Sequence, residues 1–296
     1  MANPSVPMVD GHAPFEYNGE VFQTYYKVFG DLKGRTRTPV VVLHGGPGLT
    51  HDYMLPVSDL AAVGIPVILY DQLGNGRSTH LGEKPSSFWT IDLFIDELVN
   101  VLDHFSIQDS FDLLGHSWGG ILAGEFEVRR QPAGLKHIIF SNALASGKLY
   151  GQSEHELLQP FPEWVQEGVQ LDMKDPKKFY AALKVFYAKH CCQVQPFPKE
   201  FTDSFEAVFN EEYGDGTVMS APILRNWSII DRLHLVRVPS YIVNGRDDIS
   251  QDFVVAPLFY GIAKAKWVTH DRSSHMPFWE ERERYNRLVA EFLALP

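Results

Sequence analysis

Apolar runs that end in glycine-rich turns recur along this chain and restrict its fold more than any other feature. In the first half they occupy residues 38–48 (TPVVVLHGGPG), 65–78 (IPVILYDQLGNGRS) and 109–120 (DSFDLLGHSWGG). Unbroken apolar runs of this length are typical of strands that are buried on both faces, as in a parallel sheet. Each run therefore predicts a buried strand followed by a tight turn.

Similar strand signals and two clear helices complete the pattern at both ends of the chain. Residues 90–105 have the apolar spacing of a helix, with Thr90 as the expected N-cap, and residues 281–294 read as a closing amphipathic helix. Because strands alternate with helices, we expect an α/β fold with a mostly parallel sheet. The remaining predicted strands occupy residues 21–30, 135–144, 238–248 and 265–275.

The middle of the chain has a different character. Residues 146–230 show helical periodicity interrupted by proline-containing turns, with no run that resembles a buried strand. We therefore expect residues 1–145 and 231–296 to form the α/β core. Residues 146–230 would then form a helical insertion between two core strands.

Composition and charge indicate which binding partners and which cellular compartment are expected. The net charge of −11 argues against nucleic acid or an anionic membrane surface as the main partner. Cys191 and Cys192 are adjacent and lack metal-ligand spacing, so we expect reduced thiols, no metal and no other cofactor. Residues 1–15 lack the pattern of a signal peptide, and no run approaches eighteen apolar residues. These features favour a cytoplasmic protein without a membrane span and leave the oligomeric state open.

A serine flanked by glycines marks the first candidate for chemistry. Ser117 lies in the Gly-X-Ser-X-Gly pattern of residues 113–124 (LLGHSWGGILAG), between a predicted strand and a helix-compatible segment. In a nucleophile elbow, such a turn lifts the serine hydroxyl above the sheet at a helix N-terminus, and side chains at the glycine positions would collide with the adjoining elements. The pattern also occurs in ordinary loops, so the prediction of a nucleophile elbow depends on the strand and helix that flank it.

A serine nucleophile needs a base, and the base needs an orienting acid that precedes it in the chain. The segment YIVNGRDDIS supplies Asp247 and Asp248 after one predicted strand, and DRSSHMPFWEE supplies His275 after the last strand. His270 competes with His275 but falls within the strand-like run. His116 is fixed beside the serine and cannot turn back towards it. The chain order therefore predicts a Ser-Asp-His triad.

An acyl-transfer site also needs donors for the developing oxyanion. One donor is the backbone N–H of Trp118, which follows the serine, and the second comes from the loop after an earlier strand. The segment HGGPG at 44–48 is that loop, and Gly46 is the expected second donor. The alternative is that these glycines only satisfy the backbone angles of a tight turn; both readings can hold.

Several motifs together resemble one family. HGGPGLTHDY, YDQLGNGRS, GHSWGG, NGRDDIS and SSHMPFWEE are similar to segments of the proline iminopeptidase family of α/β-hydrolases, which includes the tricorn-interacting aminopeptidase and L-amino acid amidases. They span about residues 40–280 in the expected order. The resemblance implies an α/β-hydrolase fold with an inserted helical cap. It also selects Asp248 as the triad acid, because the family's acid is the fourth residue of a Gly-x-x-Asp turn, and it leaves Asp247 as an exposed neighbour.

The chain departs from this family where the family's glutamates hold the free amine of the substrate. In the tricorn-interacting type a glutamate directly follows the catalytic aspartate, whereas Ile249 follows Asp248 here. The other family glutamate lies in the cap after a Met-Asn-Gly-Pro-like segment, and the nearest match, MSAPIL at 219–224, has none. The sequence therefore leaves recognition of a free amine open. Glu211, Glu212 and Asp215 are close in sequence and are the candidates to replace the missing glutamates, although acidic residues in a cap are more often solvated.

These observations predict a cofactor-independent serine hydrolase that cleaves a small amide or an N-terminal aminoacyl bond through an acyl-enzyme. Its substrate would be a small molecule or a short peptide. Ser117 would attack the acyl carbon, His275 would act as base, and Asp248 would orient the imidazole. The alternatives are an ester or lactone hydrolase, a lyase or isomerase on the same scaffold, and a non-catalytic ligand-binding protein. Substrate contacts are expected from His44, Gly45, Trp164, Tyr187 and Ile249.

Overall fold

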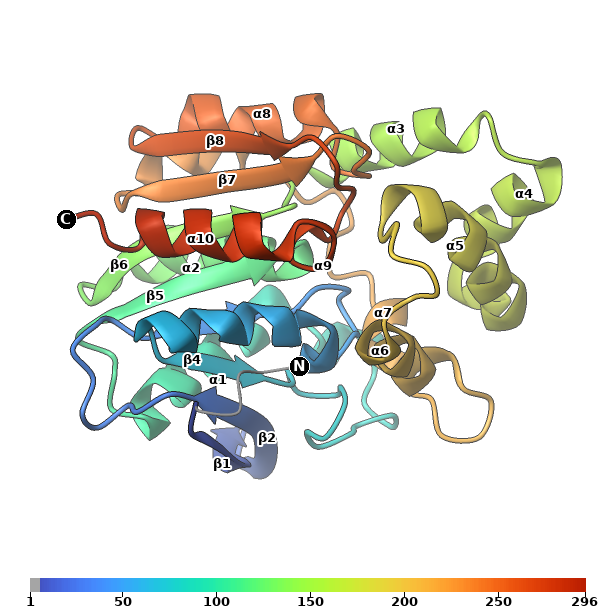
Figure 1. Cartoon of the computed structure of the whole chain (residues 1–296). Helices are drawn as coiled ribbons and strands as arrows, with labels where there is room; N and C mark the ends of the chain where they lie inside the picture. The colour runs from blue at the N-terminus through green and yellow to red at the C-terminus, as the bar shows by residue number, and fades with distance from the viewer. Residues whose placement is uncertain (1–5) are drawn as a thin grey trace.

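The computed structural model describes residues 6–296, in which a single sheet of eight strands carries helices on both faces (Figure 1). The strand order is β1-β2-β4-β3-β5-β6-β7-β8. Neighbours from β4 to β8 are parallel, whereas β1 and β2 pair antiparallel with each other and β2 pairs antiparallel with β4. The predicted α/β-hydrolase architecture is confirmed. The strands are Met8–Tyr17 (β1), Glu20–Phe29 (β2), Val40–Leu43 (β3), Val67–Tyr70 (β4), Phe111–His116 (β5), Leu135–Ser141 (β6), Ser240–Gly245 (β7) and Ala265–His270 (β8).

Helices cover the two faces of the sheet and bury a separate apolar cluster on each. In Figure 1, α10 and the 3-10 segment η1 lie in front of the sheet, while α1, α2 and α8 lie behind it. The side chains of β3 alternate accordingly, with Val40 and Val42 on the front side and Val41 and Leu43 on the back. These core elements are η1 (His51–Val63), α1 (Ile91–His104), α2 (Trp118–Arg130), α8 (Asp252–Gly261), α9 (Pro277–Glu280) and α10 (Arg282–Phe292).

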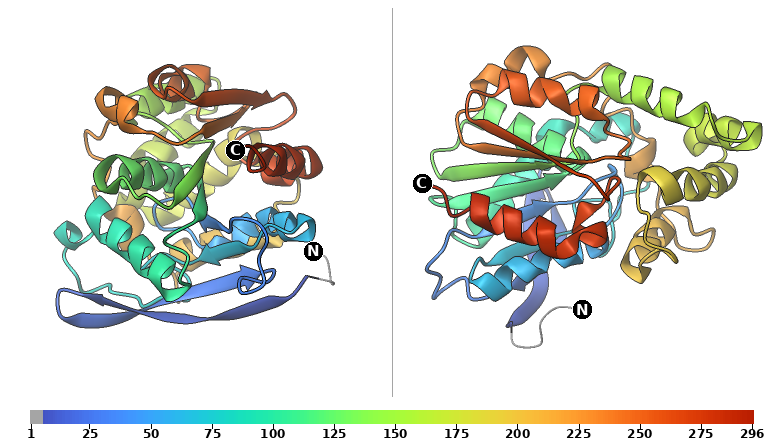
Figure 2. Two further views of the ribbon diagram at one scale, coloured as in Figure 1. Left: turned by 90° about the vertical axis from the view of Figure 1, so that its left-hand side faces the viewer. Right: turned by 45° about the horizontal axis from the view of Figure 1, so that its top comes forward.

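The chain between β6 and β7 is helical and lies beyond the carboxyl ends of the parallel strands (Figures 1 and 2). An isolated antiparallel bridge between Ser146 and Ser228 brings the two ends of this segment together. We refer to residues 146–230 as the cap. Its helices are α3 (Gly147–Leu158), α4 (Glu163–Leu171), α5 (Pro176–His190), α6 (Lys199–Phe209) and α7 (Thr217–Ser220), and short 3-10 turns occur at Asp172–Lys174 (η3) and Ile230–Leu235 (η4).

The core strands lie where the sequence predicts them, with one omission. The Thr90 hydroxyl oxygen accepts a hydrogen bond from Leu93 N at 3.1 Å, so Thr90 caps α1 as expected. Strand β1 has no clear signal in the sequence, because Gly11 and Pro14 interrupt its pattern. It forms by pairing with β2 at the edge of the sheet, where proline is tolerated.

The described part of the chain contains no helix with the length and apolar content needed to cross a bilayer. Within the same residues, no cluster of three or more histidine, cysteine or acidic side chains is arranged to hold a metal ion. Cys191 and Cys192 are both buried free thiols.

A buried carboxylate fastens the end of the cap to the core. Glu125 of α2 is fully buried and accepts hydrogen bonds from Trp227 Nε1 at 2.7 Å, from Arg232 at 2.6 and 2.9 Å, and from Arg129 Nε at 2.7 Å. Burial acting alone would raise the pKa of Glu125, but the hydrogen bonds from these donors outweigh it and lower the pKa below its usual value. Glu125 is therefore ionised in the folded protein.

Replacing Glu125 with glutamine should lower the free energy of unfolding at pH 7 by about 2 kcal/mol, because the change removes the buried charge that accepts hydrogen bonds from the partly exposed Arg129 and Arg232. Since the folded-state pKa is lowered, the contribution of the carboxylate is present above the ordinary glutamate pKa of about 4.3 and is lost as the pH falls through the folded value. Urea unfolding at pH 7 and below pH 4 measures both effects. Glu20→Gln is the control, because Glu20 is half-exposed in its pair with Lys84 and should cost under about 1 kcal/mol. Equal losses for the two variants would contradict this account.

Candidate active site

Ser117 lies in a sharp turn between β5 and α2. Its φ of 53° and ψ of −117° are unfavourable for a residue with a side chain. A Cβ at Gly115 would overlap the carbonyl of Gly119, and a Cβ at Gly119 would overlap the carbonyl of Leu43 at the end of β3. Both glycines are therefore needed, because α2 starts in direct contact with the ends of two neighbouring strands.

The expected acid and base meet at the same edge of the sheet. Asp248 follows β7, His275 follows β8, and His275 Nδ1 lies 2.6 Å from Asp248 Oδ1. Both side chains are buried. Because the carboxylate can only accept, Nδ1 carries the proton and Nε2 keeps a free lone pair. His275 and Ser117 line one cavity.

Asp248 is held by several donors. Its Oδ1 accepts from Ser250 N at 2.8 Å, and its Oδ2 accepts from Asn142 Nδ2 at 2.6 Å and from Gly245 N at 3.3 Å. Asn142 has a φ of 52° and also donates to the carbonyl of Ser274 at 3.2 Å. One amide side chain thus ties the turn after β6 to the loops that carry the acid and the base. Asn142 is not predicted from the sequence, where its only signal is a polar residue at the end of a predicted strand.

A second chain of hydrogen bonds passes through His116. His116 Nε2 lies 2.8 Å from the carbonyl of His275, and His116 Nδ1 lies 2.8 Å from the hydroxyl of Tyr53. Burial lowers the pKa of His116 far below its usual value, so its ring is neutral. Nε2 therefore donates to the carbonyl, Nδ1 accepts from Tyr53, and the Tyr53 oxygen accepts from Gly45 N at 2.5 Å. This directional chain connects the HGGPG loop to the loop of the expected base.

The expected oxyanion donors are placed on adjacent elements. Trp118 is the first residue of α2, so its N–H has no acceptor within the helix. Gly46 lines the cavity and belongs to the loop after β3, which pairs with β5 through Leu43 and Gly115. The Trp118 indole is buried and donates to Gln72 Oε1 at 2.7 Å, so this side chain anchors the turn and does not enter the cavity.

The cavity above Ser117 is small and mostly apolar. Its volume of about 210 Å³ is below the roughly 300–1,000 Å³ of pockets for drug-sized ligands. Side chains from α3, α5 and α6 line its cap side, so the cap closes over Ser117. Apart from the residues already named, the apolar and aromatic lining consists of Pro47, Leu49, Tyr150, Phe179, Leu183, Tyr187, Phe201, Phe205, Met219 and Met276.

One carboxylate faces this apolar lining. Glu154 of α3 lines the cavity together with Ser117 and His275. Burial, and secondly the negative charge of Asp172, raise the pKa of Glu154 to about 7. The sequence analysis did not select Glu154, because a glutamate in an amphipathic cap helix usually faces solvent.

Of the expected substrate contacts, the structure places only Tyr187 in the cavity lining. His44 is buried; its Nε2 accepts from Gln72 N at 3.0 Å, and burial lowers its pKa to about 4. Gly45 N is used by Tyr53. Ile249 is buried within the apolar cluster on the front side of the sheet. These three residues support the site from outside the cavity.

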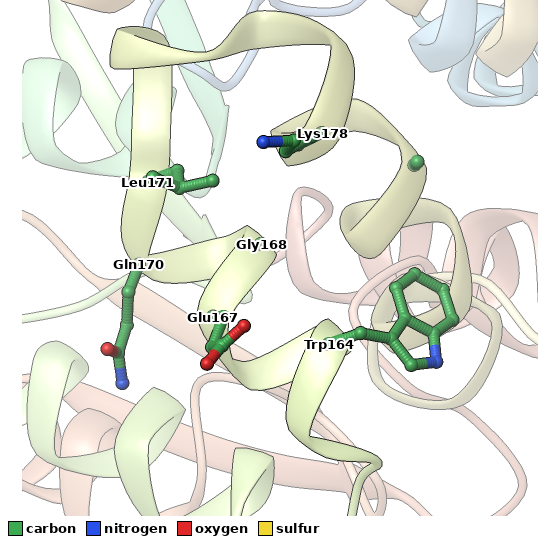
Figure 3. Close-up of a pocket in the computed structure, with 7 residues that line it drawn as sticks. Trp164, Glu167, Gly168, Gln170, Leu171 and Lys178 are labelled. Atoms are coloured by element: carbon green, nitrogen blue, oxygen red, sulfur yellow. The ribbon is translucent and has the colours of Figure 1, made fainter.

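Trp164 does not line the cavity above Ser117, contrary to the expectation from the sequence. Its side chain is 54% exposed and lines a separate surface pocket between α4 and α5 (Figure 3). Helix α4 lies at the far end of the cap from the sheet (Figure 1). Helical spacing alone could not show which face of α4 is directed to the core. The other residues that line the surface pocket of Trp164 are Glu167, Gly168, Gln170, Leu171, Lys178 and Ala181.

The three acids proposed from the sequence as amine ligands also lie elsewhere. Glu211 pairs with Lys177 at 2.9 Å on the exposed surface. Asp215 lies 2.7 Å from His80 Nδ1, and this hydrogen bond is the main reason that the pKa of Asp215 is lowered to about 2. Glu212 is exposed. None of them lines the cavity above Ser117.

Comparison with known proteins agrees with this geometry. A family model described as alpha/beta hydrolase fold matches residues 38–289. The chain therefore belongs to the α/β-hydrolase family. A proline iminopeptidase of Clostridioides difficile is 30% identical over 295 residues, which cover 97% of this chain and 98% of the relative. Another, of Saccharolobus solfataricus, is 31% identical and covers 91% of this chain and 88% of the relative. Within the larger family, the chain belongs to the proline iminopeptidase family.

Solved structures support the same placement. The crystal structure of VinJ superposes with a TM-score of 0.86 and 37% identity, covering 96% of this chain and 98% of that one. The proline iminopeptidase of Mycobacterium smegmatis superposes with a TM-score of 0.81 and 30% identity, covering 96% and 97% of the two chains. Similarity thus extends over the core and the cap.

The crowding at the elbow predicts that Gly119→Ala abolishes activity and lowers the free energy of unfolding by about 3 kcal/mol, because the new Cβ overlaps backbone atoms of β3. Gly151→Ala in α3 is the matched control. Its Cβ would meet no heavy atom within 4 Å, so the helix should gain roughly 0.5–1 kcal/mol. Urea unfolding and turnover of a chromogenic arylamide measure both. A stable, active Gly119→Ala protein would contradict the packing described.

The chain through His116 predicts a loss of activity in Tyr53→Phe. Removing the hydroxyl leaves Gly45 N–H and His116 Nδ1 unpaired in a buried site, at a cost of about 1–3 kcal/mol, and loosens the HGGPG loop. We expect kcat to fall about tenfold, with a smaller change in KM. Tyr70→Phe serves as the control, because the buried Tyr70 hydroxyl has no hydrogen-bond partner and its removal should be neutral. An unchanged kcat in Tyr53→Phe would refute the positioning role.

Proposed function

We propose that Ser117, Asp248 and His275 form the catalytic triad of a serine hydrolase that removes an N-terminal aminoacyl group, proline foremost, from a small amide or short peptide. The observation that carries this proposal is the 2.6 Å contact between His275 Nδ1 and Asp248 Oδ1, beside a strained serine that opens into the same cavity. To form an acyl-enzyme, the triad also needs a pair of hydrogen-bond donors for the oxyanion. We assign this role to the backbone N–H groups of Gly46 and Trp118.

The reaction follows from the positions of these groups. His275 Nε2 accepts the Ser117 hydroxyl proton as the oxygen attacks the acyl carbon, and Asp248 stabilises the imidazolium that results. The N–H groups of Gly46 and Trp118 stabilise the oxyanion. His275 then donates the proton to the leaving amine, and the acyl-enzyme forms. Water, activated by His275, attacks the acyl carbon and releases the acid and free Ser117.

The size of the cavity and the names of the relatives support a compact acyl group. About 210 Å³ suits one small apolar residue attached to Ser117, and aromatic side chains from the cap surround that position. Proline iminopeptidases from several organisms are about 30% identical to this chain over nearly its whole length. The ester or lactone hydrolase, the lyase or isomerase, and the ligand-binding protein are less favoured, because the similarity to proline iminopeptidases supports amide hydrolysis. Two buried free thiols fit a reducing, cytoplasmic setting.

The decisive experiment replaces Ser117 with alanine. Turnover of prolyl p-nitroanilide should fall at least about 10³-fold, since the nucleophile is lost, and Asp248→Asn should lose about 10⁴-fold through the wrong histidine tautomer. A fluorophosphonate probe should label the wild type once, at Ser117, and mass spectrometry should find no label on Ser117→Ala. Ser86→Ala, a change at an exposed serine, is the control. Labelling or turnover that survives in Ser117→Ala would overturn the assignment.

A further inference from the structure

Glu154 is a charged group that the mechanism above does not use. Among the residues that line the cavity it is the one carboxylate, and the other ionisable groups there are Tyr53, Tyr150, Tyr187, Cys191, His116 and His275. Burial raises the pKa of the tyrosines and of the thiol, which are therefore neutral, and lowers the pKa of His116. No fixed cation in the cavity lining balances a Glu154 carboxylate.

The position of Glu154 is fixed relative to the triad. Glu154 and Tyr150 are four residues apart on α3 and present one face of the helix to the cavity. Ser153, between them, donates to the carbonyl of Ile249 at 2.5 Å and accepts from Gln251 Nε2 at 2.9 Å. These bonds attach α3 to the loop that begins with Asp248. The carboxylate is therefore presented by a helix that is anchored beside the catalytic acid.

The carboxylate also lacks a partner within the protein. Glu154 is partly buried, and within residues 6–296 only burial and the charge of Asp172 act on its carboxylate, with no hydrogen bond to it. A carboxylate next to aromatic and aliphatic groups is costly to ionise unless a cation or donor meets it. A site of this kind is stabilised when a ligand brings the missing positive charge.

We propose that Glu154 binds the ammonium group of the substrate's N-terminal residue and thereby selects substrates with a free amine. The inference rests on the proposed function and deepens it, because it names the side chain that recognises the amine. Recognition of the amine then comes from α3. It does not require an acid at residue 249, in the segment 219–224, or at the surface positions Glu211, Glu212 and Asp215. One carboxylate matches one ammonium, which leaves the filled cavity without net charge.

Paired substrates test the proposal. L-Prolyl p-nitroanilide carries the ammonium, and cyclopentanecarboxylic p-nitroanilide has the same ring size without the nitrogen. The measured quantity is the ratio of kcat/KM for the first substrate to kcat/KM for the second. We compare the wild type, Glu154→Gln and Glu156→Gln. Glu156 lies on the same helix but is exposed, where it accepts from Gln152 at 2.9 Å.

The wild-type ratio should exceed about 10. In Glu154→Gln the ratio should fall by about 10- to 100-fold, as expected for the loss of a charged hydrogen bond. In Glu156→Gln the ratio should stay at the wild-type value. A ratio unchanged in Glu154→Gln overturns the proposal. That result would fit a protonated Glu154 that donates to a neutral group, since glutamine also donates. If the wild type hydrolyses both substrates with a ratio near 1, amine selection fails while the proposed function stands. If the wild type hydrolyses neither and no probe labels Ser117, both fail.

A pH series on the wild type provides a second measurement that does not depend on a variant. The groups that face Glu154 are Asp172, whose negative charge favours the protonated form, the neutral Tyr150, Tyr187 and Cys191, and the triad pair. With a free-enzyme pKa of about 7, Glu154 gains a proton as the pH falls from 8 to 6 and loses its charge. The substrate ratio should fall severalfold over this range. A group that does not distinguish the two substrates affects both alike and cancels from the ratio, so a ratio that is constant with pH contradicts the proposal.

Discussion

The contact between the first turn of α2 and the ends of β3 and β5 is the constraint on which the rest of the site depends. It forms only because Gly115 and Gly119 lack side chains, and it forces Ser117 to a positive φ. The same contact sets the N-terminus of α2 beside the HGGPG loop. The proposed nucleophile and both proposed oxyanion donors therefore derive from one packing arrangement, which positions each of them through the backbone.

Two hydrogen-bonded systems extend this arrangement to the other strands. Asn142 joins the turn after β6 to Asp248 and to the carbonyl of Ser274, while His116 and Tyr53 join the carbonyl of His275 to Gly45. Both systems use a carbonyl of the loop after β8 as an acceptor, so they hold the backbone of the base from two directions. The His275 ring is then free to bond only Asp248 and the reacting groups. In a buried site such bonds are effective because no water competes with them.

The cap determines what reaches Ser117. Its helices α3, α5 and α6 supply an apolar lining and one carboxylate, and α3 is attached to the loop of the catalytic acid through Ser153. The cap side of the cavity and the proposed triad are thus parts of one connected structure. Family membership fixes the class of chemistry.

The sequence by itself determined the α/β fold, because buried parallel strands need continuous apolar runs and the elbow needs its glycines. It also singled out Ser117, Asp248 and His275 as expected triad residues, since each follows a strand and carboxyl ends of parallel strands share one edge. It could not place Trp164, which faces outward, or identify Glu154, Asn142 and Tyr53. Helical periodicity shows that a face is buried but not which neighbour covers it, and the contacts of a cap helix or a buried polar side chain depend on segments far apart in the chain. Only the tertiary structure decided which polar groups share the cavity, because their partners are set by packing between elements and not by local sequence.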